Sequence, residues 1–118
     1  MLITKELMSK LKKYFIQYSK YAVFVENNRQ DFAFADELEE KMCRLIEKII
    51  AYYAKRDEEK SRFIEECIIG QKSWRLAYDE LHIEYRTYYT WKQEILSDMV
   101  IGAVVKGLIT LDIDLDIG

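Results

Sequence analysis

Residues 85–93 gather side chains of the kinds that contact nucleic acids. On a helical wheel, the side chains that point away from the apolar face of this segment are Tyr85, Arg86, Thr87, Tyr89, Thr90, Lys92 and Gln93. Arginine can donate two hydrogen bonds to guanine, the threonine methyl group can contact thymine, and tyrosine and lysine suit phosphates. The alternative interpretation is a solvated helix face that binds nothing. We expect these residues to contact duplex DNA.

Three further candidates for phosphate contact precede this segment. Lys72 and Arg75 flank the Ser73 hydroxyl and the free backbone amides of an expected helix N-terminus, and such a combination can hold a phosphate group. Capping of the helix by Ser73, with the two cations in solvent, explains the same residues equally well. Both interpretations stay open at the level of the sequence.

These candidates belong to a pattern of two short helices joined by a tight turn, which spans residues 73–99. The apolar faces consist of Leu76, Ala77 and Leu81 in the first helix and of Ile83, Tyr88, Trp91, Ile95 and Leu96 in the second. His82 occupies the turn, where a left-handed backbone is often needed and where histidine is better tolerated than a β-branched residue. Two helices fixed at a steep angle let the second enter a major groove while the first crosses the backbone. The pattern predicts a helix-turn-helix.

Aligned without a gap, the motif resembles the fourth, promoter-reading region of bacterial sigma factors. Ser73 falls on the hydroxyl that caps the first helix, and Leu81 and Ile83 fall on the two apolar positions of the turn. Tyr88 and Trp91 fall on the buried positions of the recognition helix. The resemblance implies a sigma-like unit that recognises promoter DNA.

Residues 85–92, Tyr-Arg-Thr-Tyr-Tyr-Thr-Trp-Lys, also resemble the Arg-Thr-Tyr-Tyr-x-x-Lys stretch of phage-encoded regulators of the ArpU and RinA type. The likeness extends over residues 58–100, with Glu84 standing where a serine or threonine usually begins the recognition helix. The resemblance implies a phage or prophage transcription regulator that binds promoter-proximal duplex DNA. It further implies activation of late genes together with RNA polymerase.

The distribution of charge bears directly on this expectation. The net charge is −3, and residues 1–56 carry 11 basic and 8 acidic side chains, whereas residues 57–100 carry 6 basic and 10 acidic ones. Because neutralisation of phosphates dominates affinity for nucleic acids, an acidic helix-turn-helix half needs its few cations on one face or help from a partner. The alternative function is therefore a protein-interaction module that binds RNA polymerase or another regulator and does not bind DNA itself.

The composition favours long helices in an all-α chain. The 118 residues include no proline and only four glycines. No apolar run approaches a membrane span and the N-terminus lacks the apolar core of a signal peptide, so we expect a cytoplasmic protein. Cys43 and Cys67 stand alone on apolar helical faces, as buried free thiols do. The sequence shows no nucleophile–base pair, metal-ligand cluster or phosphate-binding loop, so we expect no catalysis, no cofactor and no metal.

Apolar stripes of helical period mark the expected elements. Two long helices, at residues 3–25 and 36–56, are joined by a short polar loop and are expected to lie antiparallel. A third helix is expected to close at Gly70. The recognition helix is expected to stop at Gly107.

In this interpretation the chain has three parts. Residues 1–56 form an N-terminal helical hairpin for dimerisation or partner contact, and residues 57–106 form the three-helix DNA-binding unit. Residues 107–118 form an acidic tail, in which residues 111–117 alternate apolar and acidic side chains as strands do. The tail could pair with its own copy in a dimer, dock on another protein or fray.

The apolar stripe of the first helix predicts a homodimer. Its members are Leu7, Leu11, Phe15, Tyr18 and Ala22. A hairpin beside a small three-helix unit offers limited surface to cover this stripe, and a large apolar patch left in water is uncommon for a monomer. A second copy would cover the stripe in a four-helix arrangement. The alternative is a compact monomer in which the hairpin folds back on residues 57–106.

Overall fold

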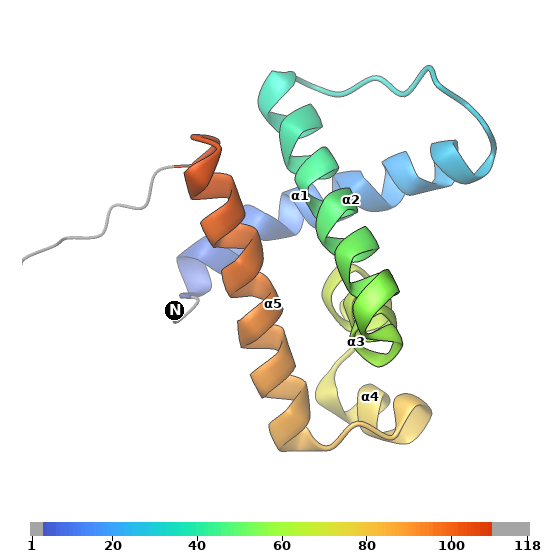
Figure 1. The fold of residues 1–118 in the computed structure, drawn as a ribbon, viewed down its shortest axis with the longest axis vertical. Coiled ribbons are helices and arrows are strands. Elements are labelled where there is room, and N and C mark those ends of the chain that lie inside the picture. Colours follow the sequence, from blue (N-terminus) through green and yellow to red (C-terminus); the bar gives the residue numbers. More distant parts are fainter. Residues whose placement is uncertain (1–3, 110–118) are drawn as a thin grey trace, which may run out of the picture.

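The structure is a computed structural model that describes residues 4–109, and these residues form helices and connecting loops without any strand (Figure 1). The elements are α1 (Lys5–Glu26), α2 (Glu37–Arg56), α3 (Glu58–Phe63), the π-helical segment η1 (Ile64–Ile69), α4 (Trp74–Leu81) and α5 (Tyr85–Val105). The all-α fold class predicted from the sequence is confirmed.

Side-chain caps explain where the helices begin. The carboxylate of Asp36 accepts a hydrogen bond from the backbone N–H of Glu39 at 2.8 Å, and the Glu39 carboxylate accepts one from the N–H of Ala35 at 2.9 Å. This reciprocal arrangement satisfies one amide donor of the first turn and the donor of the residue just before the cap. Asp57 caps α3 in the same way through the N–H of Lys60, at 3.1 Å. Local sequence therefore determines both helix starts.

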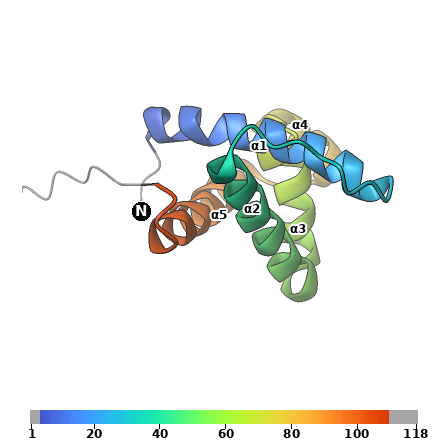
Figure 2. The same ribbon diagram turned by 90° about the horizontal axis from the view of Figure 1, so that it is seen from above.

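The first two helices do not form the antiparallel hairpin expected for residues 1–56. Instead α1 crosses α2 steeply, and the loop at residues 27–36 spans the gap between their ends (Figures 1 and 2). Aromatic side chains hold this loop in place, because Phe32 packs edge-on against Phe24 and Phe34 packs against Tyr21. The polar residues of the loop therefore do not make a tight turn.

The boundary expected at residues 56 and 57 falls within a single hydrophobic core. Helix α1 packs on α2 and η1, α2 packs on α3 and α5, and α4 packs on α5. The largest fully buried side chains come from both sides of the boundary, and they are Leu11, Phe15, Met42, Cys43, Ile46, Phe63, Ile64, Ile68, Ile95, Leu96, Met99 and Val100. The N-terminal helices therefore help to build the core on which α4 and α5 pack.

This packing corrects the interface proposed for a homodimer. Leu11 and Phe15 are only 2% and 1% exposed, because α2 and η1 cover the apolar stripe of α1 within one chain. Leu7 and Tyr18 also pack against the core, and Ala22 is half-buried. Leu11 and Phe15 cannot meet a second copy of this fold. A homodimer stays a prediction, but without the interface that motivated it.

The end of η1 differs in detail from expectation. The chain leaves the helix at Gly70, but the φ of Gly70 is −77°, and Gln71 takes the left-handed conformation with a φ of 57°. The absence of a side chain at Gly70 lets the backbone pass close to Glu66, because a Cβ atom there would lie 2.5 Å from the carbonyl oxygen of Glu66. A side chain at position 70 would therefore push against backbone atoms.

Helix α5 ends as expected. Gly107 has a φ of 70°, in the left-handed region that glycine enters without strain. Leu108 and Ile109 then pack against the core. The alternating pattern at residues 111–117 lies outside the described residues.

Candidate nucleic-acid interface

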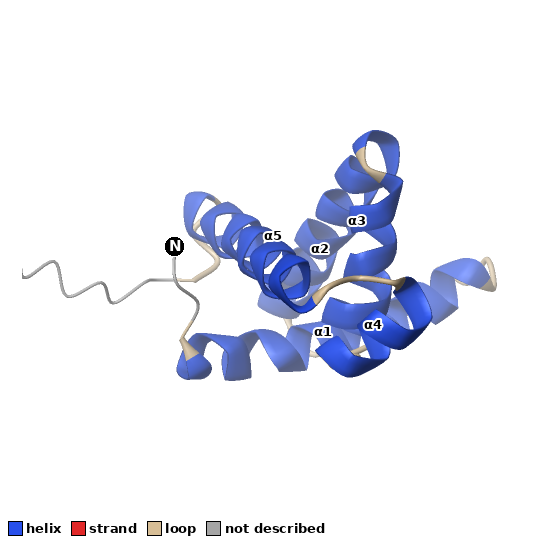
Figure 3. Ribbon diagram, turned by 90° about the horizontal axis from the view of Figure 1, so that it is seen from below, coloured by secondary structure: helices blue, strands red, loops and turns tan. Residues whose placement is uncertain are grey.

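A short left-handed turn joins α4 to α5, and Figure 3 shows the two helices side by side from the end where α5 begins. His82 has φ 57° and ψ 36°, and its backbone N–H donates to the carbonyl of Ala77. The N–H of Ile83 donates to the same carbonyl at 3.3 Å. These bonds satisfy the last turn of α4. The left-handed residue predicted at His82 is confirmed.

Tyr88 fastens the beginning of α4 to α5. Its hydroxyl donates to the carbonyl oxygen of Lys72 at 2.6 Å, and its side chain is buried. Its ring packs edge-on against Phe63 at 5.4 Å between centroids, and Trp91 packs edge-on against the same Phe63 ring at 5.6 Å. Burial raises the pKa of Tyr88 to about 12, so the hydroxyl keeps its proton and remains a donor. This contact fixes the angle between the two helices.

Four of the seven side chains assigned to the outer face of α5 are exposed, and they are Tyr85, Arg86, Tyr89 and Thr90. Lys92 and Gln93 are half-buried, and Gln93 does interact with neighbouring residues. Thr87 is half-buried and lines a hollow beside the turn together with Arg62 and Trp91. The exposed face of α5 is therefore narrower than the helical wheel suggested.

The candidates around the start of α4 are mostly engaged by other residues. The ammonium group of Lys72 forms ion pairs with Glu66, at 3.4 Å, and with Glu80, and these contacts raise the pKa of Lys72. The Ser73 hydroxyl accepts from the N–H of Leu76 at 3.4 Å and so serves as a helix cap. Only Arg75 is exposed without a carboxylate partner in the described residues, with its guanidinium 5.6 Å from the centroid of the Trp74 ring.

The cations of residues 57–100 form two groups, those in ion pairs and those without a carboxylate partner in the described residues. Lys60 pairs with Glu94, while Arg62 and Lys72 share Glu66. The three cations of this segment that have no carboxylate partner within residues 4–109 are Arg75, Arg86 and Lys92. All three belong to α4 or α5. The unpaired positive charge of this acidic half is therefore concentrated on the two helices of the motif.

An aromatic cluster, which the sequence analysis did not identify, connects the same two helices. Trp74 packs edge-on against Tyr85 at 5.1 Å, Tyr85 against Tyr89 at 4.8 Å, and Tyr89 against Tyr88 at 5.0 Å, all between ring centroids. Tyr85 and Tyr89 are 56% and 41% exposed, so this cluster forms part of the surface. Trp74 and Tyr85 belong to different helices, and only the angle at the turn brings them together.

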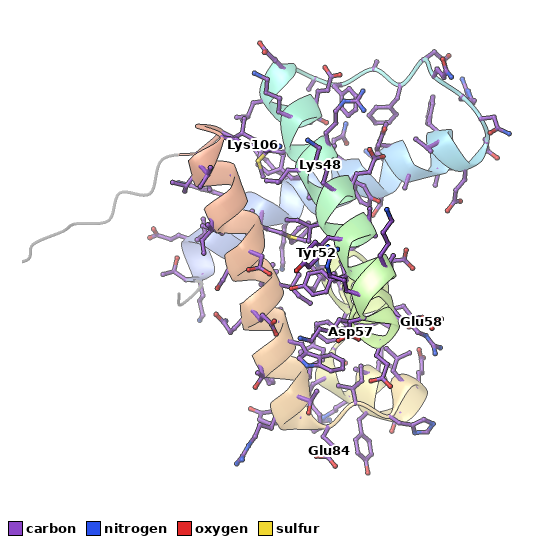
Figure 4. All side chains as sticks on the ribbon, in the orientation of Figure 1. Lys48, Tyr52, Asp57, Glu58, Glu84 and Lys106 are labelled. Carbon is purple, nitrogen blue, oxygen red and sulfur yellow. The ribbon has the colours of Figure 1, made fainter. Side chains whose placement is uncertain are left out.

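Glu84 marks the exposed end at which α5 begins (Figure 4). Its side chain makes no capping hydrogen bond, although it occupies the N-cap position. A carboxylate there interacts favourably with the positive end of the helix dipole. It also adds a negative charge at the end of α5 where DNA contact is expected. Affinity for phosphate at this end of α5 therefore depends on cations that lie farther along the helix.

Comparisons of this chain with protein-family models, with characterised proteins and with solved structures find no match. Among the described residues, no helix is long and apolar enough to cross a membrane. Nor does any group of three or more His, Cys, Asp or Glu side chains within residues 4–109 gather as metal ligands would. Cys43 and Cys67 are buried free thiols, as their positions on the helical stripes predicted.

Proposed function

We propose that this chain is a transcription regulator that binds duplex DNA through the helix-turn-helix of α4 and α5. The observation that carries the proposal is the exposed start of α5, where Arg86 projects without a carboxylate partner in the described residues and stands one helical turn before Thr90. An arginine in that position suits guanine in a major groove, and a threonine suits thymine. The likeness of residues 85–92 to phage regulators extends the proposal to promoter-proximal DNA and to activation of phage or prophage late genes with RNA polymerase.

The rest of α5 supports this role by holding the exposed turns rigidly. The helix has 21 residues, and its second half is buried through Ile95, Leu96, Met99 and Val100. The first half lies beside α4 (Figures 1 and 3). A side chain on a rigid helix loses less conformational entropy on binding than one on a loop. Arg86 is therefore well placed for recognition of a base edge.

The test is a mobility shift with labelled duplex from the region upstream of the chain's own gene, at stated salt. If Arg86 contacts a base, Arg86→Ala should lower the affinity by about 1–3 kcal/mol, or roughly 5- to 150-fold. Arg29→Ala is the matched control, because Arg29 lies in the loop between α1 and α2 and pairs with Asp31. Equal affinity of the wild type and the Arg86→Ala, Lys92→Ala double variant would refute the groove assignment.

A second function has one specific observation in its favour. The outer face of α4 exposes Leu76 and Tyr78, at 45% and 56%, next to the acidic residues Asp79 and Glu80. Exposed apolar and aromatic side chains beside charged ones are typical of protein interfaces. We propose as the alternative that α4 docks on RNA polymerase or another regulator without DNA contact. Pull-down with purified polymerase tests it: Leu76→Ser and Tyr78→Ser should weaken capture, and Arg86→Ala should not.

A further inference from the structure

The second half of α5 exposes an apolar patch on the side that faces away from the core. Ile101, Val104 and Val105 are exposed there, Val105 by 79%, and their spacing makes them neighbours on the helix surface. The opposite side of the same turns is buried through Met99 and Val100. Figures 1 and 2 show α5 at one edge of the molecule, where α1 and α2 cover only its inner side. Residues 4–109 therefore leave this patch uncovered.

Two opposite charges stand on one flank of the patch, the flank that faces α2. Asp98 precedes the patch, and its carboxylate accepts a hydrogen bond from the hydroxyl of Tyr53 on α2 at 2.7 Å. Lys106 directly follows the patch, and Figure 4 shows it near Lys48 of α2. Lys106 has no carboxylate partner within residues 4–109, and its interaction with Lys48 lowers its pKa. The flank therefore offers a cation that lacks a counter-ion and a carboxylate with a second oxygen that can accept.

This arrangement of charge and apolar surface is self-complementary. In a two-fold pair of antiparallel α5 helices, residues at equal distances before and after the axis lie opposite each other, and each flank meets the same flank of the other copy. Positions 98 and 106 have their midpoint at 102, and the patch at 101–105 has its midpoint at 103. A single axis therefore brings the two patches together and sets Lys106 of each copy opposite Asp98 of the other.

We propose that the second half of α5 forms a two-fold interface with a second copy of this chain. The apolar patch lies at the centre of this interface, and Lys106 of each copy pairs with Asp98 of the other. The stripe of α1 from which the sequence predicted a homodimer is buried, so the interface uses a different helix. An unrelated partner would need only apolar surface here, whereas opposite charges placed symmetrically about the patch fit another α5.

The interface leaves the proposed DNA-binding surface free. Arg86 lies 19 residues before Val105 on the same helix, which corresponds to about 29 Å. Antiparallel pairing places the two copies of Arg86 at opposite ends of the helix pair. The inference therefore does not depend on the function proposed above, and a chain that binds no DNA could still pair in this way.

The experiment measures the mass of the full chain by sedimentation equilibrium over a dilution series. A contact made mainly by one helix from each chain is small beside the roughly 1,200–2,000 Å² that stable complexes bury, so the dimer should dissociate on dilution. As the concentration falls from about 200 to 1 μM, the mass should decrease from near twice 14.2 kDa toward 14.2 kDa.

Three variants locate the interface. Val105→Lys should weaken dimerisation by about 10-fold or more, because it places an ammonium group in the apolar centre. Ile16→Lys is the matched control, because Ile16 is an exposed apolar residue of α1 outside the patch, and it should dimerise as the wild type does. Lys106→Gln should weaken dimerisation roughly 2- to 30-fold, because two surface ion pairs are lost, and should make it less sensitive to salt.

Several results would overturn the inference. A mass of 14.2 kDa at every concentration would do so, and if Val105→Lys then also lowered the free energy of unfolding, the patch would be covered within the chain instead. A dimer that Val105→Lys leaves intact, or that Ile16→Lys disrupts, would place the interface elsewhere. Equal dependence on salt in the wild type and in Lys106→Gln would rule out the ion pairs.

Discussion

The left-handed turn at His82 permits a sharp test of the motif's geometry. With φ 57° and ψ 36°, His82 occupies a region that costs an ordinary residue about 1–2 kcal/mol. Its imidazole is exposed and makes no hydrogen bond or ion pair with residues 4–109, so substitutions there change the backbone preference and little else. His82→Val should lower the free energy of unfolding by about 1–2 kcal/mol, because β-branched residues tolerate this region poorly.

Replacement of His82 by glycine should not lower the free energy of unfolding. Glycine enters the left-handed region freely but costs about 0.5–1 kcal/mol of extra chain entropy on folding, so His82→Gly should range from neutral to about 1 kcal/mol stabilising. The matched control is Glu84→Val in the same turn, where φ is −71° and ψ is 154°, an extended conformation that suits valine. It should lower the free energy of unfolding by about 0.3–1 kcal/mol, because the carboxylate at the positive end of the α5 dipole is lost, and so by less than His82→Val does.

Urea denaturation followed by tryptophan fluorescence measures these differences, because Trp74 and Trp91 flank the turn on either side. The expected order of stability is His82→Gly, then wild type, then His82→Val. A His82→Val variant as stable as the wild type would refute the left-handed turn. So would a His82→Gly variant less stable than His82→Val.

Three further predictions concern packing and burial. Gly70→Ala should destabilise the fold by about 1–3 kcal/mol in the same denaturation assay, because the new Cβ would lie 2.5 Å from the carbonyl oxygen of Glu66; unchanged stability would contradict this packing. Cys43 and Cys67 should not react with a thiol reagent at pH 8 until the chain unfolds, since burial raises their pKa values to about 12 and about 11; rapid labelling of the native chain would contradict their burial. The free energy of unfolding should fall as the pH rises from 10 toward 12, because Tyr88 keeps its proton in the fold but loses it in the unfolded chain. Denaturation at pH 9 and at pH 11 tests whether stability falls, and Tyr88→Phe should make the stability less dependent on pH.

The features that could be predicted from sequence are those that a few neighbouring residues determine. The left-handed turn at His82 could be predicted because histidine tolerates a positive φ better than β-branched residues do. The cap at Ser73 could be predicted because its hydroxyl directly precedes a segment with the apolar periodicity of a helix. The stop of α5 at Gly107 has the same local origin. The burial of Tyr88 followed from its place on the apolar stripe of the second helix. Such signals do not depend on where the rest of the chain goes.

Features that depend on distant residues were predicted poorly. The crossing of α1 over α2 depends on loop aromatics such as Phe32, whose partners cannot be read from a periodic pattern. The acids that neutralise Lys72 come from η1 and α4, so the loss of this cation from the candidate phosphate site is a tertiary effect. Leu11 was expected to lie on an uncovered apolar stripe because the N-terminal helices were treated as a separate unit. In the structure it is buried in the single core.

The single core also changes how the acidic character of residues 57–100 bears on DNA binding. Ion pairs neutralise part of the negative charge in this segment, because Glu94 pairs with Lys60 and Glu66 pairs with both Arg62 and Lys72. The basic excess lies in residues 1–56, which would be of no use to the motif if they formed a detached hairpin. Because α1 packs against η1, its lysines are held at a fixed position relative to the rest of the core, and after burial the charge of Lys12 is the next cause that lowers the pKa of Lys92. The N-terminal helices can therefore supply positive charge to the motif as well as part of its core, and a partner protein is not the only way to offset the acidic half.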